Sequence, residues 1–220
     1  IAFTVITLLP LVFGAVMYTK AENTIQEQIY QYNEVMMNNV SSELDKYYSE
    51  IEMLCNQVSE IETLNALIEN NDVTKEDVYI NSSKLMNDLV QINSHPYINN
   101  IYVYIEKADM IITRSEVSNL KDFFEKGMVK FADYDFDKWK EQYFEGVQYK
   151  QYFPQITLVT GNSEQNVFLY GQSIPSTSVR NIKARIYILV DVSSVLRRVQ
   201  MSGANEGEFI LMDKNQNILI

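Results

Sequence analysis

The first third of the chain carries an apolar repeat with the period of an α-helix. Neither Gly nor Pro occurs between Ala15 and His95, and apolar residues recur at steps of three or four. The mean step is about 3.6 residues, which is the α-helical period. The repeat consists of Ile25, Ile29, Tyr32, Met36, Val40, Leu44, Tyr47, Ile51, Leu54, Val58, Ile61, Leu64 and Ile68. One long helix is predicted, and its apolar stripe must be buried against a domain, a second copy of the chain, or both.

The second half of the chain alternates strand-like and short helical patterns. Residues 98–105 (INNIYVYI) place Ile and Val on one face and Tyr on the other, which predicts a strand. A turn at 106–109 is expected to return the chain as a hairpin through 110–114. Further helices are predicted over 78–92, 120–128, 136–144 and from Ser193 or Ser194 to Val199, and further strands over 155–160, 166–174, 184–191, 208–212 and 217–220. This order predicts an α+β fold in which a long helix packs on a PAS-like antiparallel sheet.

The N-terminal segment is uncharged and apolar. Residues 1–18 read IAFTVITLLPLVFGAVMY, and a membrane-spanning helix needs about 20 such residues, so a span is predicted over residues 1–19. The rival interpretation is a signal peptide, which would need a small-residue cleavage site that does not follow. Because Lys20 is the only nearby cation, residues 20–220 are expected outside the cell. Since the chain begins inside this run and ends in a strand pattern, we expect an internal piece of a longer protein.

Composition and charge narrow the function classes. The net charge is -11 and the pI about 4.6, which disfavours contact with nucleic acid. Residues 20–80 hold 3 Lys and 13 Asp or Glu, which we interpret as a solvated helix face. The single cysteine, Cys55, excludes an intrachain disulfide, and one histidine, His95, gives little support to a hydrolase. We expect no enzymatic activity, cofactor or metal.

Three aspartates near the start of one predicted helix suggest an enzyme hypothesis. Asp133, Asp135 and Asp137 lie close in sequence, and paired carboxylates could serve a cell-wall hydrolase. Their spacing at a helix start is more typical of N-terminal capping.

Several segments together form a characteristic arrangement. They are the apolar N-terminus, the long helix, INNIYVYIEKADMIITRSEV, YDFDKWKEQYFEGVQYKQYFPQ, RIYILVD with SSVLRRVQ, and EFILMDKNQNILI. This arrangement resembles the extracytoplasmic double Cache sensor of Gram-positive transmembrane regulators. Within that group, YVYIEKADMIIT and the Trp139 segment ending at Tyr152-Phe153-Pro154 are most similar to membrane-bound AraC-type transcriptional regulators. A sister group carries a histidine kinase as its output.

The resemblance implies an organisation and partners. Residues 20–203 would form the long helix and a membrane-distal Cache module with its sheet in 98–191, and residues 204–220 would begin a membrane-proximal module. DNA would be bound only by a cytoplasmic part beyond this sequence. The expected partners are a second copy in a homodimer and a small molecule, a saccharide in particular, or a solute-binding protein. Members that bind amino acids carry an Arg-x-Trp-Tyr cluster, whereas Trp139 here lies between Lys138 and Lys140.

A tyrosine-lined pocket is the candidate binding site. Ligand pockets combine apolar walls with a few placed polar groups, and the tyrosines of the predicted sheet fit this description. The alternatives are sheet packing for the tyrosines, a core position for the Trp, and an ion pair with Glu116 for the Arg. The candidate ligand-binding residues are Tyr102, Tyr104, Arg114, Trp139, Tyr170 and Tyr187. Cys55 is predicted to be a small buried residue.

Overall fold

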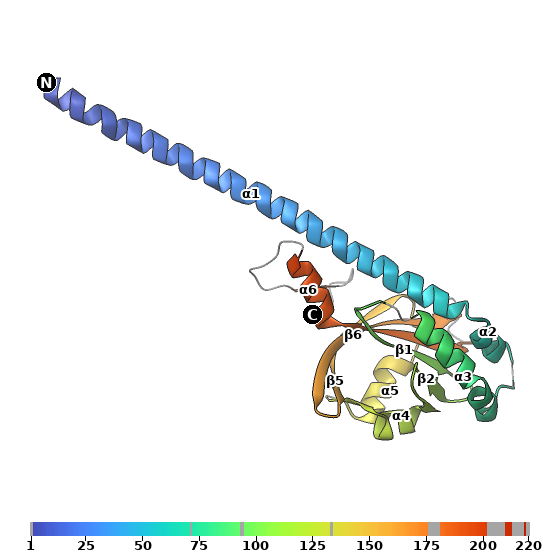
Figure 1. Ribbon diagram of the computed structural model, residues 1–220. Coiled ribbons are helices and arrows are strands. Elements are labelled where there is room, and N and C mark those ends of the chain that lie inside the picture. Colours follow the sequence, from blue (N-terminus) through green and yellow to red (C-terminus); the bar gives the residue numbers. More distant parts are fainter. Residues whose placement is uncertain are drawn as a thin grey trace.

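A long helix and a curled antiparallel sheet dominate the computed structural model of the chain (Figure 1). The structure describes residues 2–70, 72–92, 95–132, 134–175, 181–201, 210–212 and 218, with only the backbone for residues 2–9 and 11. The helix lies along one face of the sheet and projects well beyond it, and the short helices over residues 120–126 and 136–144 lie on the opposite face (Figure 1). The predicted α+β class with a long helix packed on an antiparallel sheet is confirmed.

The elements follow the predicted order with several adjusted bounds. The helices are α1 (Ala2–Ser59), α2 (Glu62–Glu69), α3 (Lys75–Ile92), α4 (Leu120–Lys126), α5 (Phe136–Phe144) and α6 (Val192–Met201). The strands are β1 (Ile98–Ile105), β2 (Met110–Ile112), β3 (Val117–Asn119), β4 (Val129–Phe131), β5 (Gln151–Thr160), β6 (Ser163–Ile174) and β7 (Ala184–Asp191). The short strands β3 and β4 were not predicted.

The sheet has the order β3-β2-β1-β7-β6-β5-β4, and neighbouring strands are antiparallel. The predicted hairpin of β1 and β2 pairs Val103 with Ile112. The crossover from the first strands to β5, β6 and β7 brings β7 back beside β1, which gives the sheet its PAS-like arrangement. The most apolar strand, β7, thus lies between β1 and β6 and is buried on both faces.

Strand β1 divides its side chains between two cores. Ile101, Val103 and Ile105 belong to the core that faces α1, whereas Tyr102 and Tyr104 belong to the core on the opposite face. All five side chains are buried. The period of two in the sequence therefore separates the two sides of the molecule, as predicted.

The stripe of α1 is buried only in its C-terminal half. Tyr47, Ile51, Leu54 and Val58 pack into the core formed with the sheet, α2 and α3. Residues closer to the N-terminus, from Ile25 to Val35, leave more than half of each large apolar side chain exposed. The sheet thus buries about half of the predicted stripe.

The long helix ends earlier than predicted, and the expectation that it continues through Ile68 was wrong. The Glu60 N–H donates to the Asn56 carbonyl at 3.1 Å, and the Ser59 hydroxyl donates to the same carbonyl at 2.7 Å. Ile61 then adopts a non-helical conformation with ψ of 121°. The turn allows α2 to return its apolar side, including Leu64, to the core. The helix therefore ends where the chain must turn to bury α2, although the sequence has no Gly or Pro at this position.

The predicted membrane span and the predicted start of a second module are only partly described by the structure. The side chains of residues 1–9, half of the predicted membrane span, lie outside the described part. No helix among the described residues combines the length and the apolar character that crossing a membrane requires. Most of residues 204–220, the predicted start of a second module, also lie outside the described residues, although Met212 and Ile218 form an antiparallel bridge there.

Candidate functional site

The sheet face opposite α1 carries an aromatic core beneath α4 and α5. Trp139 of α5 lies at its centre and is only 1% exposed. Its ring centroid is 4.7 Å from that of Phe144 and 4.9 Å from that of Phe131. The other aromatic members of this core are Tyr102, Tyr104, Phe123, Tyr143, Phe153 and Tyr187. Trp139 therefore occupies a core position over the sheet tyrosines.

The structure brings four of the six predicted site residues together. Tyr102 of β1 lies directly across from Tyr187 of β7, and Tyr104 follows on the same face. Trp139 covers this face from α5. No ligand contact is implied by this packing alone, since a buried aromatic core has the same composition.

The other two predicted residues lie elsewhere. Tyr170 is on the opposite face, where its ring packs 5.0 Å from that of Tyr152, which in turn contacts Tyr48 of α1. Arg114 is exposed in the turn between β2 and β3. Burial raises the pKa of the Tyr102 hydroxyl. The charge of Glu116 raises this pKa further, and the charge of Arg114 lowers it.

A buried arginine that the sequence interpretation did not single out lies beside the tyrosines. Arg185 of β7 is 4% exposed and lies directly across from Tyr104. One of its terminal nitrogens donates to the Phe144 carbonyl, and the other donates to the Gly146 carbonyl at 2.9 Å. Its guanidinium also lies 2.5 Å from a carboxylate oxygen of Glu106. A charge this deeply buried needs such partners, because leaving it unpaired would be strongly destabilising.

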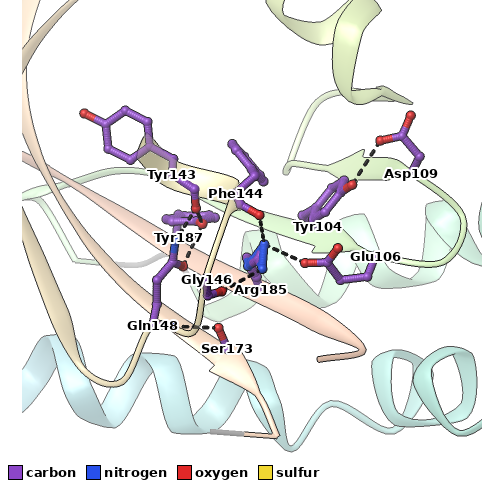
Figure 2. A network of polar contacts seen from close by, with 10 residues as sticks. All are labelled: Tyr104, Glu106, Asp109, Tyr143, Phe144, Gly146, Gln148, Ser173, Arg185 and Tyr187. Atoms are coloured by element: carbon purple, nitrogen blue, oxygen red, sulfur yellow. Dashed lines mark hydrogen bonds and ion pairs between the residues drawn. The ribbon is translucent and has the colours of Figure 1, made fainter. Parts of the chain in front are cut away.

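The arginine belongs to a polar network that we call the Arg185 cluster (Figure 2). Its members come from the β1–β2 hairpin, from the end of α5 and the loop after it, and from β6 and β7. They are Tyr104, Glu106, Asp109, Tyr143, Phe144, Gly146, Gln148, Ser173, Arg185 and Tyr187.

Gln148 attaches the loop after α5 to the sheet. The Tyr187 hydroxyl contacts Gln148 Oε1 at 2.7 Å and also the Tyr143 carbonyl. The Gln148 N–H donates to Ser173 Oγ at 3.0 Å, and the Ser173 N–H donates to the Gln148 carbonyl at 2.8 Å. This loop is therefore held to two strands at its middle.

Burial controls the protonation of the cluster. It raises the pKa of Glu106, although the nearby Arg185 guanidinium acts in the opposite direction and Asp109 adds to the rise. Burial also raises the pKa of Tyr187 and of Tyr104, whose hydroxyl donates to Asp109 at 3.0 Å. The tyrosines thus remain neutral hydrogen-bonding groups at neutral pH.

Some buried polar atoms on this face have no hydrogen-bond partner among the described residues. They are Tyr102 Oη, Trp139 Nε1, Arg185 Nε and the Glu106 oxygen beside Arg185. That oxygen is within ion-pair distance of the guanidinium without being aligned for a hydrogen bond. Each unmade hydrogen bond costs about 1–3 kcal/mol. These atoms are buried, so a polar molecule could pair with them only if the surrounding side chains moved.

A cavity of about 390 Å³ opens behind Glu106 at the ends of β1 and β7. Its size is within the range of small-molecule sites, about 300–1,000 Å³. The lining residues are Ile68, Asn70, Val73, Ile105, Glu106, Lys107, Asn181, Ile182 and Lys183. Glu106 is both a cavity wall and the partner of Arg185, so it links the cavity to the cluster.

The described members of the acidic triplet at the start of α5 lie at positions where acidic residues favour a helix N-terminus. Asp135 is the N-cap of α5, and its carboxylate accepts from the Lys138 N–H at 2.9 Å. Asp137 lies in the first turn, and Asp133 is outside the described residues. Within the described ranges, no three His, Cys, Asp or Glu side chains gather as a metal site would require.

Comparisons with known proteins give a weak structural resemblance. No protein-family model and no curated protein matches the sequence. Among solved structures, the sensory domain of the Campylobacter jejuni chemoreceptor Tlp3 with isoleucine bound is 15% identical, with 84% of this chain and 73% of that chain covered and a TM-score of 0.39. Its complex with L-norvaline is 16% identical over 86% of this chain and 69% of that chain, with a TM-score of 0.38. At this identity and TM-score, the resemblance assigns neither a family nor a ligand.

Proposed function

We propose that the chain is the extracytoplasmic ligand-sensing region of a membrane-anchored signal receptor, with no catalytic role of its own. The observation that carries this proposal is the two-sided sheet. One face holds the buried Arg185 cluster, in which Arg185 Nε and a Glu106 oxygen make no hydrogen bond, and the other face holds α1, whose N-terminal half extends away from the module. A ligand at the first face can thus act on a helix at the second.

The physical requirement for such signalling is unequal affinity. A ligand shifts a conformational equilibrium only as far as its binding energies to the two states differ, and typical coupling energies are about 1–3 kcal/mol. The Arg185 cluster supplies groups whose pairing a ligand would change, namely the guanidinium, the Glu106 carboxylate and the carbonyls of Phe144 and Gly146 that accept from the guanidinium.

The ligand that we propose is a small polar molecule. The sequence resemblance favours a saccharide, and the Tlp3 sensory domain has been solved with isoleucine. A screen should therefore contain both classes. The test is thermal unfolding of the purified 220-residue chain in the presence of each compound. A true ligand at 100 times its Kd adds about 2.7 kcal/mol to the free energy of unfolding.

Matched variants locate the binding site. Tyr104→Phe removes a hydroxyl on the cluster face, whereas Tyr170→Phe removes one on the face of α1. Loss of the ligand-induced stabilisation in Tyr104→Phe but not in Tyr170→Phe supports the site. In the receptor, Tyr104→Phe should abolish the response of a ligand-dependent reporter and Tyr170→Phe should keep it, whereas Trp139→Ala would remove the centre of the aromatic core and destabilise the fold. If folded variants respond normally, a surface that senses a partner protein becomes the better explanation.

The proposed topology places residues 1–19 in the membrane and residues 20–220 outside the cell. An AraC-type DNA-binding output and a homodimer complete the proposal, and a histidine kinase output is the alternative. Asn162 is exposed in the turn between β5 and β6, so Asn162→Cys should react with an impermeant maleimide on intact cells. The wild-type chain is the control, because its Cys55 is buried. Labelling of Asn162→Cys only after lysis would reverse the topology.

A further inference from the structure

We infer that the segment between α5 and β5, residues 145–150, is a strap that couples the Arg185 cluster to α1 through an ion pair between Lys150 and Glu52. The inference rests on the proposed function for its biological meaning, and its physical content concerns this chain alone. A change at the cluster would alter the contact between the strap and α1.

The strap is attached at three points. Near its start, the Gly146 carbonyl accepts from Arg185 at 2.9 Å. At its middle, Gln148 exchanges hydrogen bonds with Ser173. At its end, Lys150 Nζ lies 2.6 Å from Glu52 Oε2 on α1. Six residues thus connect the two faces of the sheet.

The strap continues directly into a strand that touches both sides. In β5, Phe153 packs into the aromatic core with Tyr143. Its neighbour Tyr152 packs against Tyr48 of α1, with ring centroids 5.0 Å apart. A displacement of the strap would therefore be transmitted to side chains on α1 as well as to the cluster.

The backbone at Lys150 indicates that its side chain matters. Lys150 has a φ of 47°, in the left-handed region that non-glycine residues adopt only at an energetic cost. Gly146, four residues earlier, has a φ of 73°. Glycine would satisfy the Lys150 backbone better, so the lysine is explained by what its ammonium group contacts, which is Glu52.

The ion pair is partly shielded from solvent. The Lys150 and Glu52 side chains are 36% and 35% exposed, against 76% and 58% for the pair of Lys138 with Asp135. Shielded pairs are less screened by salt than exposed ones.

Cys55 provides a native reporter of this contact. It follows Glu52 by one turn of α1, is fully buried, and is the only cysteine in the chain. Burial raises the pKa of its thiol to about 12, with Glu52 adding to the rise and Lys150 opposing it. Removing the Lys150 charge without opening the structure would thus make the thiol less reactive.

The test measures the rate at which N-ethylmaleimide alkylates Cys55 in the full chain at one pH. Lys150→Met keeps most of the aliphatic stem but loses the ion pair with Glu52. The strap should then loosen, and the alkylation rate should rise at least threefold. Loss of the Lys150 charge alone would lower the rate, because it would raise the pKa of the Cys55 thiol. Two variants of the residues that hold the strap should raise the rate as well: Arg185→Lys, which loses the paired carbonyl contacts, and Ser173→Ala, which loses the hydrogen bond from the Gln148 N–H but keeps the backbone one. Lys138→Met removes an equal charge from an exposed pair on α5 and should leave the rate unchanged.

The outcomes separate the strap from the sensor proposal. Hydrogen exchange of residues 145–150 shows whether each variant loosens the strap, and Trp139 fluorescence shows that it is folded. If Ser173→Ala and Arg185→Lys loosen the strap and the Cys55 rate stays at the wild-type value, the coupling is refuted. Lys150→Met decides the matter even if Arg185→Lys does not fold, because a Cys55 rate at the wild-type value in that variant also refutes the coupling. Because the measurement needs no ligand, a refuted strap leaves the sensor proposal standing, and a ligand screen without a hit leaves the strap standing.

Discussion

Gly171 of β6 allows the aromatic rings of the cluster face to lie against the sheet. A Cβ placed there would be 2.9 Å from Phe153 Cε2 and 3.0 Å from Tyr187 Cε1, closer than an ordinary van der Waals contact. Neither ring can move freely, because Tyr187 is held by Gln148 and Phe153 packs against Tyr143. Gly171→Ala should therefore overpack this face.

The size of the effect follows from two opposing terms. Overpacking of a buried site costs about 1–3 kcal/mol, and replacing Gly by Ala at a compatible backbone position returns about 0.4–1 kcal/mol. We expect a net loss of roughly 0.5–2 kcal/mol in the free energy of unfolding. Urea denaturation followed by Trp139 fluorescence measures it, since Trp139 is the only Trp and lies in the same core.

A double-mutant cycle tests the cause of that loss. In a Phe153→Leu background the nearest ring atom is absent, so Gly171→Ala should be less destabilising than in the wild type. If Gly171→Ala is as stable as the wild-type chain, or if its effect is the same in both backgrounds, the proposed close packing over Gly171 is incorrect.

Three further predictions concern other parts of the chain. Leu54→Ala, at a position 1% exposed, should cost about 2–5 kcal/mol in urea denaturation, whereas Ile29→Ala, at a position 53% exposed, should change the purified chain by less than about 0.5 kcal/mol; equal effects would contradict the burial of α1. Asn119→Ala removes the side-chain cap that accepts from the Asp122 N–H at 2.9 Å and should cost about 0.5–2 kcal/mol in the same assay, while Asn162→Ala in an exposed turn serves as the control. Burial raises the pKa of Glu106, so this group favours folding most at acid pH and loses that contribution as the pH rises through its folded pKa. The wild type should therefore lose stability relative to Glu106→Gln as the pH rises from about 4, and a relative gain would show that attraction to Arg185 outweighs burial.

Patterns with a clear period were predictable from the sequence. The bounds of α5 and β7 match the prediction, and the alternation in β1 correctly placed Tyr102 and Tyr104 on one face. In α5 and β1 the apolar positions repeat at the period of the element, whereas β7 is recognised as a continuous apolar run that is buried on both faces.

Features set by tertiary contacts were not predictable. The break after Ser59 has no Gly or Pro, and the three-residue strands β3 and β4 are too short to show a period. Arg185 was overlooked because it lies in the most apolar strand, although it is two residues from Tyr187 and therefore on the same face. Tyr170 was grouped with the other tyrosines by residue type, whereas strand pairing places it opposite Ile188 and thus on the face of α1.

The division of β1 between two cores limits changes in its length. Inserting or deleting one residue between Ile101 and Ile105 would send the tyrosines toward α1 and the aliphatic side chains toward α5, so both cores would be lost together. The pairing with β7 is irregular between Ile98 and Asn100, where side chains are partly buried, and the turn at 106–109 follows the strand. Insertions and deletions in this region, natural or engineered, should therefore be confined to those two places. Within β1, a substitution by a side chain of similar size should be tolerated more readily than a shift of one residue.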